Sequence, residues 1–291
     1  MDIEKNLTEE ELKLILAEKR FQKDLLVKDY YLTILLYLLK DVKEIYFKGG
    51  TALQKTVLDY SRLSEDIDFT IETNLVVVRG KMISVINKSD LFGEISFGKD
   101  VNGFVRLIVP YKTKLGQGEL FIDLNERGKL FLKPEKLELK HFYPNIPQFS
   151  FPCLSKEEIV AEKVAAAIGR NKPRDHYDIY QIIKHNIPIN MSLVKKKCQQ
   201  SGDEFNITKM FNKAQTLYKR CIQKSCFTKP FKTVNFYLHR YLICKSPIIS
   251  CSPTTNIIFF SIHNFICNNK SFIRPLTCFC LDWNEIILIL V

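Results

Sequence analysis

Two short stretches, Lys48-Gly49-Gly50-Thr51-Ala52-Leu53 and Arg62-Leu63-Ser64-Glu65-Asp66-Ile67-Asp68-Phe69, decide the predicted fold. The first is typical of a strand end, a diglycine turn followed by a hydroxyl residue, and the start of a helix. Backbone N–H groups at such a helix start can approach a phosphate closely, because glycine has no Cβ that blocks the approach. Many diglycine turns are purely structural, so this stretch alone is only a weak indication of phosphate binding.

The second stretch leads into a predicted strand over residues 67–71. Alternate residues of a strand share a face, so Asp66 and Asp68 point one way while Ile67 and Phe69 point toward a core. Two neighbouring carboxylates repel each other unless a cation lies between them, and oxygen ligands suit Mg²⁺ or Mn²⁺. The alternative is a solvated strand edge with two acids of no function. The phosphate-type turn about fifteen residues upstream favours the metal site.

A lone acid, Asp123, interrupts the apolar strand Leu120-Phe121-Ile122-Asp123-Leu124. It could be a third carboxylate that activates an attacking hydroxyl as general base and shares a metal with Asp66 and Asp68. The alternative is an acid at a strand end that faces a turn.

Lys163 lies in an alanine-rich segment, and a helix is predicted from Ser155 to Arg170. Small alanines allow this helix to pack tightly, which fixes the lysine on a rigid element. A lysine ammonium is a compact, mobile point charge that suits a triphosphate. The alternative is an exposed helix with ordinary ion pairs.

A second helix is predicted to begin at Pro173 and to run through Ile183. Asp175 and Asp178 share a face of it at a spacing of i,i+3, and Arg174 shares a face with Asp178 at i,i+4. His176 is interpreted as a packing or surface residue without a catalytic role.

The remaining patterns predict an α+β protein with a mixed α/β half followed by helices. Capping boxes begin at Thr8 and Ser155, where a hydroxyl residue precedes a glutamate by three positions. The other expected elements are helical patterning over 9–39 with a break near 23–29, strands over 44–47, 95–97, 104–111 and 119–124, the last three antiparallel, helices over 51–59 and 76–86, and a loop-rich segment over 134–152.

The composition is that of a globular protein with a sizeable core: 291 residues, 46% of them hydrophobic and 26% charged. No apolar run reaches the roughly 18 residues that a membrane span needs, and the chain start is acidic and polar. We therefore expect a soluble, cytoplasmic protein without a membrane partner. The net charge of +11 favours an anionic partner such as a nucleotide or RNA. The nine cysteines show no paired zinc-ligand spacing.

The chain changes character near Cys226. Beyond Ser225 there is no Gly, Ala or Met, and the only acids are Asp282 and Glu285. Neither helical nor strand periodicity is sustained there. We predict a catalytic domain with N-terminal helices over 1–150, a helical region completing the site over 151–225, and an atypical, frameshifted or read-through tail over 226–291. The alternative for the tail is a helical accessory domain.

Together these motifs resemble the nucleotidyltransferase AbiEii/AbiGii toxin family, within the DNA polymerase β-like nucleotidyltransferase superfamily. The resemblance covers roughly residues 45–180 and implies a small mixed sheet flanked by helices, followed by a helical C-terminal half. The matching residues are Lys48-Gly49-Gly50-Thr51-Ala52-Leu53, Arg62, Ser64, Asp66-Ile67-Asp68, Glu162-Lys163, Arg174-Asp175 and Asp178.

The resemblance also implies roles for individual residues. Where the superfamily usually has Gly-Ser at the phosphate turn, this chain has Gly50-Thr51, which keeps a hydroxyl. The expected catalytic residues are Asp66, Asp68, Asp123, Lys163 and Asp178; the expected nucleotide-binding residues are Lys48, Gly49, Gly50, Thr51, Arg62, Ser64, Arg174 and Asp175; the expected metal ligands are Asp66, Asp68 and Asp123.

The expected function is Mg²⁺-dependent (or Mn²⁺-dependent) transfer of a nucleotide from an NTP to a hydroxyl acceptor. The acceptor is expected to be RNA such as tRNA, and the protein to be the toxin of a toxin–antitoxin or phage-defence system with a cognate antitoxin. Two alternatives remain open at this point: a nucleotidyltransferase that modifies a small molecule such as an antibiotic, and a degenerate, non-catalytic nucleotide-binding remnant.

Overall fold

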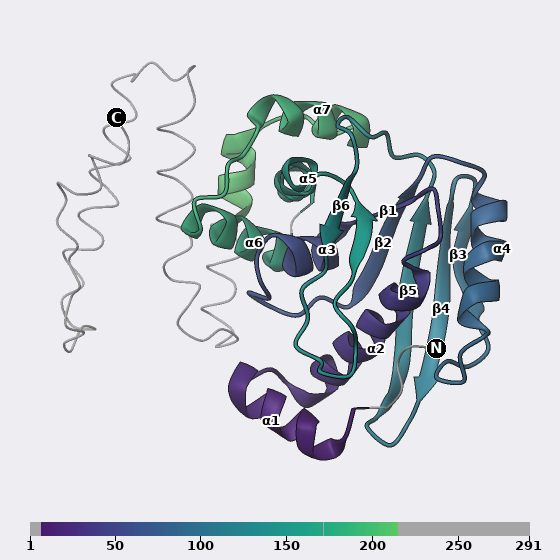
Figure 1. Ribbon diagram of the computed structural model, residues 1–291. Coiled ribbons are helices and arrows are strands. Elements are labelled where there is room, and N and C mark those ends of the chain that lie inside the picture. The colour runs from purple at the N-terminus through teal and green to yellow at the C-terminus, as the bar shows by residue number, and fades with distance from the viewer. Residues whose placement is uncertain (1–6, 171, 215–291) are drawn as a thin grey trace, which may run out of the picture. The chain divides into compact units, whose positions relative to one another are not determined.

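A single mixed sheet forms the centre of the protein. The computed structural model describes residues 7–170 and 172–214, so the tail predicted after residue 225 lies outside the described residues. Within them, the strand order is β3-β4-β5-β2-β1-β7-β6 (Figure 1). The strands are β1 (Ile45–Lys48), β2 (Asp66–Ile71), β3 (Ser96–Val101), β4 (Phe104–Lys112), β5 (Gln117–Asn125), β6 (Glu135–Glu138) and β7 (Ser150–Cys153).

Helices flank this sheet, as the α+β prediction expects. Helix α4 packs against α2 and β5 and is linked to β3 by the Arg79–Asp100 ion pair, whereas α3, α5, α6 and α7 gather near β1, β7 and β6 (Figure 1). No helix in the described part of the chain is both long and apolar enough to cross a bilayer. The named helices are α1 (Glu9–Lys19), α2 (Lys23–Leu39), α3 (Gly49–Thr56), α4 (Leu75–Ile86), α5 (Lys156–Gly169), α6 (Pro173–Lys184) and α7 (Met191–Ser201), and residues 207–214 are helical as well.

The predicted capping box at Thr8 is confirmed. The Glu11 amide donates to Thr8 Oγ1 over 3.2 Å, and the Thr8 amide donates to Glu11 Oε2 over 2.8 Å. The break between the first two helices lies earlier than predicted, because Arg20 adopts a left-handed conformation (φ 56°) that ends α1.

The segment 134–152 was predicted as a loop, and this prediction is wrong at both of its ends. It contains β6, and β7 begins at its C-terminal end and pairs in parallel with β1 through Phe47 and Cys153. Both strands are only four residues long and lie in a proline-rich segment, so the alternation of polar and apolar residues that identifies a strand cannot be recognised in the sequence. The prediction of antiparallel pairing is confirmed for β3, β4 and β5, while β5 pairs in parallel with β2.

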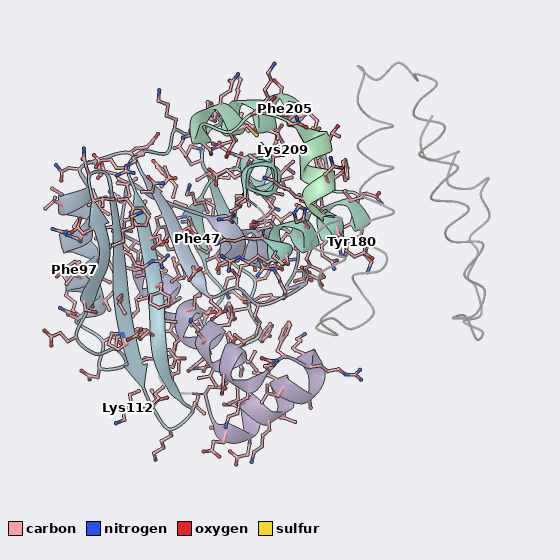
Figure 2. The ribbon with its side chains drawn as sticks, turned by 180° about the vertical axis from the view of Figure 1, so that it is seen from behind. Phe47, Phe97, Lys112, Tyr180, Phe205 and Lys209 are labelled. Atoms are coloured by element: carbon pink, nitrogen blue, oxygen red, sulfur yellow. The ribbon has the colours of Figure 1, made fainter. Side chains whose placement is uncertain are left out.

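Alternation along β2 divides its residues between the core and the opposite face. Ile67 and Phe69 are fully buried, whereas Asp66 and Asp68 are only partly buried. Phe69 packs against Phe47 and Phe151, with ring centroids 5.7 and 5.6 Å away. Figure 2 shows Phe47 in the interior of the molecule and Phe97 on the outermost strand, β3. The acidic face of β2 is therefore held in place by an aromatic core behind it.

A buried ion pair anchors α3 to α2. Lys55 on α3 is fully buried, and its Nζ lies 2.9 Å from Asp29 Oδ1. Three hydroxyls join this pair: Thr33 Oγ1 lies 2.9 Å from Lys55 Nζ, and Tyr143 Oη and Tyr60 Oη lie 2.8 and 3.2 Å from Asp29 Oδ2. Burial lowers the pKa of Lys55, although the Asp29 carboxylate opposes this shift. Since α3 begins at the diglycine motif, this network fixes the direction in which the helix leaves that motif.

Replacement of Asp29 by Ala should lower the free energy of unfolding by about 3–5 kcal/mol, because Lys55 loses its counter-ion while it remains buried. Urea denaturation followed by circular dichroism measures this change. Glu18→Ala, which removes the exposed Lys19–Glu18 pair, is the matched control and should cost no more than about 1 kcal/mol. Equal effects of the two substitutions would show that the buried pair is not what anchors α3.

Candidate functional site

Four charged residues lie opposite one another across four adjacent strands. Lys48 on β1 pairs with Asp68 on β2, Asp68 pairs with Asp123 on β5, and Asp123 pairs with Arg106 on β4. Residues paired directly in this way project from the same face of a sheet. We call these four residues the charged row. The predicted strand alternation at Asp66 and Asp68 is confirmed, and it places Asp66 on the same face, two positions before Asp68.

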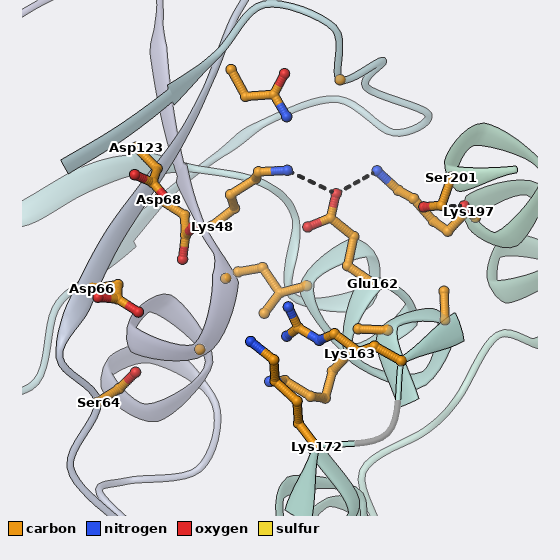
Figure 3. A pocket seen from close by; sticks show the side chains of 18 of the residues that line it. Lys48, Ser64, Asp66, Asp68, Asp123, Glu162, Lys163, Lys172, Lys197 and Ser201 are labelled. Carbon is orange, nitrogen blue, oxygen red and sulfur yellow. Dashed lines mark hydrogen bonds and ion pairs between the residues drawn. The ribbon is translucent and has the colours of Figure 1, made fainter. Parts of the chain in front are cut away.

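The charged row lines a cavity of about 460 Å³. In Figure 3 the carboxylates of Asp66 and Asp68 lie on one side of this cavity, and Lys163 and Lys172 extend from the other side. Burial raises the pKa of Asp68 to about 6; Lys48 opposes the shift, and the nearby carboxylates of Asp123 and Asp66 add to it. Ionisation of Asp68 in this cavity is therefore costly, chiefly because the carboxylate is buried.

The absence of a side chain at Gly49 leaves the space that the Asp68 carboxylate occupies. The glycine has φ +78°, and a Cβ added to it would lie 2.1 Å from Asp68 Oδ2. Both the conformation and the space thus require glycine at residue 49. A Cβ at Gly50 would meet Ser64 Oγ at 3.0 Å, with Lys163 Nζ 3.9 Å away, so the second glycine brings the backbone close to polar groups of the cavity.

The Thr51 hydroxyl does not point into the cavity. It donates a hydrogen bond to the backbone carbonyl of Asp66, and the residue is 1% exposed. In this geometry the side chain ties the start of α3 to β2, and a contact of Thr51 with a triphosphate stays a prediction. Contact with phosphate is also open to the backbone N–H groups of Gly49 and Gly50, and both residues line the cavity.

Lys163 on α5 is held by two buried carboxylates of α6. Its Nζ lies 3.0 Å from Asp175 Oδ1 and 2.9 Å from Asp178 Oδ2. Asp178 also accepts two 2.7 Å hydrogen bonds from Arg62, and Arg170 donates to Asp175 Oδ2 over 2.8 Å. Burial opposes ionisation of Asp175, but the hydrogen bonds from Arg170 and the attraction of Lys163 outweigh it and hold its pKa below the usual value.

Asp175 and Asp178 are both fully buried, and neither lines the cavity. The geometry therefore does not show the direct substrate contacts expected of them, as a nucleotide-binding and a catalytic residue. Their ion pairs instead fix the positions of three cations that line the cavity, Lys163, Arg62 and Arg170. Arg174, by contrast, is exposed and lines the cavity, as expected of a nucleotide-binding residue.

Asp66 and Asp68 fit a divalent cation. Mg²⁺ is commonly bound by one or two carboxylates together with water and substrate phosphates, so two acids suffice. Asp123 is engaged elsewhere, because its two oxygens accept 2.7 Å hydrogen bonds from Nε and Nη2 of Arg106. Among the residues that the structure describes, no group of three or more His, Cys, Asp and Glu side chains is arranged to hold a metal ion. The role of Asp123 as third ligand stays a prediction.

Comparison with known families identifies the chain. The model of the nucleotidyl transferase AbiEii toxin of type IV toxin–antitoxin systems matches residues 33–221. This chain belongs to the AbiEii family. The family named from the sequence motifs and the nucleotidyltransferase class are thereby confirmed.

Solved structures share the fold of this AbiEii protein. MenT4, a nucleotidyltransferase toxin from Mycobacterium tuberculosis H37Rv, aligns with a TM-score of 0.55 and 22% identity over 78% of this chain and 75% of MenT4. JHP933 from Helicobacter pylori aligns with a TM-score of 0.54 and 18% identity over 84% of this chain and 99% of JHP933. A comparison with curated protein sequences gives no match.

Several cations of the cavity were not singled out from the sequence as site residues. Arg106, like Asp123, is a lone charged residue in an apolar strand, so the sequence pattern that indicated Asp123 also indicates Arg106. Lys197 offers no such signal, because it lies in a lysine run of α7. It is nevertheless buried, and its Nζ lies 2.9 Å from Glu162 Oε1, which Lys48 Nζ approaches at 3.5 Å (Figure 3). The other cavity cations not expected are Arg127, Arg170 and Lys172.

Replacement of Gly49 by Ala should reduce nucleotide transfer by this AbiEii protein at least about tenfold, because the new Cβ displaces the Asp68 carboxylate and strains the backbone. Gly80→Ala is the matched control: no atom lies within 4 Å of its added Cβ, and in the middle of α4 it should stabilise the protein by about 0.5–1 kcal/mol. Nucleotide-transfer assays measure the activity of both variants, and circular dichroism shows whether each is folded and how stable it is. Full activity of folded Gly49→Ala would contradict the close approach.

Asp68 should reduce stability at neutral pH. Its folded pKa of about 6 lies above the ordinary aspartate pKa of 3.8, so the folded state binds the extra proton between these two values and stability falls as pH rises through this window. Asp68→Asn should therefore be more stable than the native chain by about 2–3 kcal/mol at pH 7.5. Urea denaturation at several pH values should show this difference shrinking toward pH 4. A pH-independent difference would contradict the shift.

Asp178→Asn should have the opposite effect on stability at pH 7.5. The substitution leaves Arg62 and buried Lys163 short of a counter-charge, and should cost about 3 kcal/mol or more. The same urea measurement tests it. A neutral effect would mean that Asp178 does not hold the two cations.

Proposed function

We propose that this chain transfers a nucleotide from an NTP to a hydroxyl of an RNA acceptor, such as tRNA, in a Mg²⁺-dependent reaction. The observation that supports this proposal is the position of Asp68. Its carboxylate adjoins the diglycine start of α3, and it lies in a cavity that Asp66 and Lys163 also line.

The triphosphate would bind along the wall that the diglycine motif and α5 form. Backbone N–H groups of Gly49 and Gly50 at the start of α3 can donate to phosphate oxygens. Ser64, Arg62 and Lys163 surround Gly50, and they supply a hydroxyl and two cations at the same point. The ion pairs of Lys163 with α6 hold its ammonium in place before the substrate arrives, so little reorganisation is needed on binding.

Asp66 and Asp68 would hold Mg²⁺. When bound, this ion neutralises charge that develops on the phosphate oxygens. The acceptor hydroxyl attacks the α-phosphorus in line, the bond to the β-phosphate oxygen breaks, and pyrophosphate leaves. The hydroxyl proton passes to a base, for which Asp123 is the proposed residue because it lies next to Asp68 in the sheet.

An RNA acceptor is favoured by the charge of the cavity. Its described lining includes nine Lys or Arg residues and four Asp or Glu residues. Arg106 and Arg127 lie on the β4–β5 side, away from the proposed triphosphate wall, where an acceptor backbone could be bound. Binding that depends on such contacts weakens as salt rises.

The family match supports a biological setting as well. Members are toxins of type IV toxin–antitoxin systems, so we infer that the chain acts with a cognate antitoxin. A role in phage defence and a location in the cytoplasm, where NTPs and tRNA are abundant, are part of the same proposal.

The proposal is tested by incubating the purified full chain with Mg²⁺, each labelled NTP in turn and total RNA. A labelled band of tRNA size is expected, and Asp66→Ala or Asp68→Ala should lower its yield by at least about a hundredfold while the protein stays folded. Chelation by EDTA should have the same effect. Label in a small molecule but not in RNA would contradict the acceptor, and full activity of either Asp variant would contradict the metal site.

A further inference from the structure

Arg106 makes an unusually strong contact for a residue at the edge of the cavity. It binds Asp123 through two hydrogen bonds of 2.7 Å, one from Nε and one from Nη2. This parallel fork is the strongest geometry for a guanidinium and a carboxylate. It neutralises the charge of Asp123 and occupies one lone pair on each of its oxygens. As the structure stands, the guanidinium engages both oxygens of Asp123, so the carboxylate attracts a second cation weakly.

The charged row explains why this contact matters for the metal. Lys48 is opposite Asp68 and Arg106 is opposite Asp123, so each carboxylate of the row has one cation beside it. A divalent cation bound by Asp66 and Asp68 would lie next to Asp123 in the sheet register. It would attract the carboxylate that Arg106 holds, and it would repel the guanidinium. The metal and Arg106 therefore favour different states of Asp123.

Arg106 can leave Asp123 without leaving the cavity. Its side chain is 36% exposed, whereas that of Asp123 is 13% exposed. An arginine fork fits a phosphate as well as it fits a carboxylate. Arg127 lines the same cavity and is fixed by a 2.7 Å hydrogen bond from its Nε to the carbonyl of Asn102. A phosphate of an RNA backbone near Arg127 would thus offer Arg106 a second anion.

We propose that Arg106 and the divalent cation compete for Asp123, and that a backbone phosphate of the RNA acceptor ends this competition by drawing the guanidinium away. Asp123 then becomes the third carboxylate of the metal site only when the acceptor is bound. Arg106 is in this account a positioning residue that couples metal binding to acceptor binding. Such coupling would keep the NTP from reacting with water when no acceptor is present. The inference rests on the proposed function and adds an order of events to it: the acceptor binds first, and Asp123 joins the metal site afterwards.

The first test measures Mn²⁺ affinity of the full chain by electron paramagnetic resonance, without RNA or NTP. Arg106→Gln should bind Mn²⁺ about five- to tenfold more tightly than the native chain, because Asp123 is then free. Arg127→Gln is the matched control: it removes the same charge from the same cavity but no contact with a carboxylate, and its affinity should change less than about twofold. Arg106→Lys, which keeps the charge and loses the fork, should lie between the two.

Equal effects of Arg106→Gln and Arg127→Gln would overturn the inference, since the gain would then reflect net charge alone. An unchanged or weaker affinity of Arg106→Gln would also overturn it. Both results leave the proposed function intact, provided that Asp66→Asn lowers the affinity. If Asp66→Asn binds Mn²⁺ as the native chain does, the metal site of the proposed function fails, and the inference fails with it.

The second test measures the coupling itself, by fluorescence anisotropy of a labelled single-stranded RNA with and without Mn²⁺. Since coupling is reciprocal, Mn²⁺ should tighten RNA binding by the native chain about fivefold. Asp66→Asn lacks a ligand of the proposed metal site, so any tightening that Mn²⁺ still causes in this variant comes from Mn²⁺ bound to the RNA itself. This part is subtracted from the effect in the other chains. Asp123→Asn, in which Arg106 is free from the start, should bind RNA equally with and without the metal after that correction. The same corrected response in the native chain and in Asp123→Asn would contradict the proposal.

Discussion

The Asp68 carboxylate fills the space that any side chain at residue 49 would need, and the rest of the site depends on this close approach. Glycine at that position lets α3 begin directly beside β2, so that backbone donors and a carboxylate adjoin each other. The Asp68 carboxylate is buried there, and burial, with a smaller contribution from the carboxylates of Asp123 and Asp66, raises its pKa. A site that accepts this cost in stability is typical of one that awaits a cation.

Two buried networks keep the walls of the cavity in place. The Lys55–Asp29 pair fixes α3 on α2, and the two carboxylates of α6 fix Lys163 on α5. The second network also includes Arg62, which comes from the segment between α3 and β2. The ion pairs of Asp178 thus join the N-terminal mixed half and the helical half at the cavity. Pre-ordered cations of this kind stabilise a charged transition state with little reorganisation.

The sequence predicted the centre of the site because its signals are local. The diglycine motif, the alternation of Asp66 and Asp68 and the alanine-rich segment around Lys163 each follow from residues close together in the chain. The roles of Asp175 and Thr51 could not be read in this way, since each depends on a partner from another element. The same holds for β6 and β7, whose pairing with each other and with β1 makes strands of two short segments.

Long-range register decides what the charged residues do. Neither Arg106 nor Asp123 reveals its partner in the sequence, because the pair forms only when β4 and β5 align. Parallel pairing of β5 with β2 then places Asp123 beside Asp68. The fold turns single charges in apolar strands into an ordered set, and from this set the coupling of metal and acceptor follows.

The central claim is that Asp66 and Asp68 hold a divalent cation beside the diglycine motif. A crystal of the protein grown with Mn²⁺ and a non-hydrolysable NTP analogue tests it most directly, through anomalous scattering of the metal. The account predicts a Mn²⁺ peak about 2.0–2.3 Å from a carboxylate oxygen of each residue, with the triphosphate against Gly49 and Gly50. A triphosphate bound elsewhere, or a metal that touches neither aspartate, would contradict it.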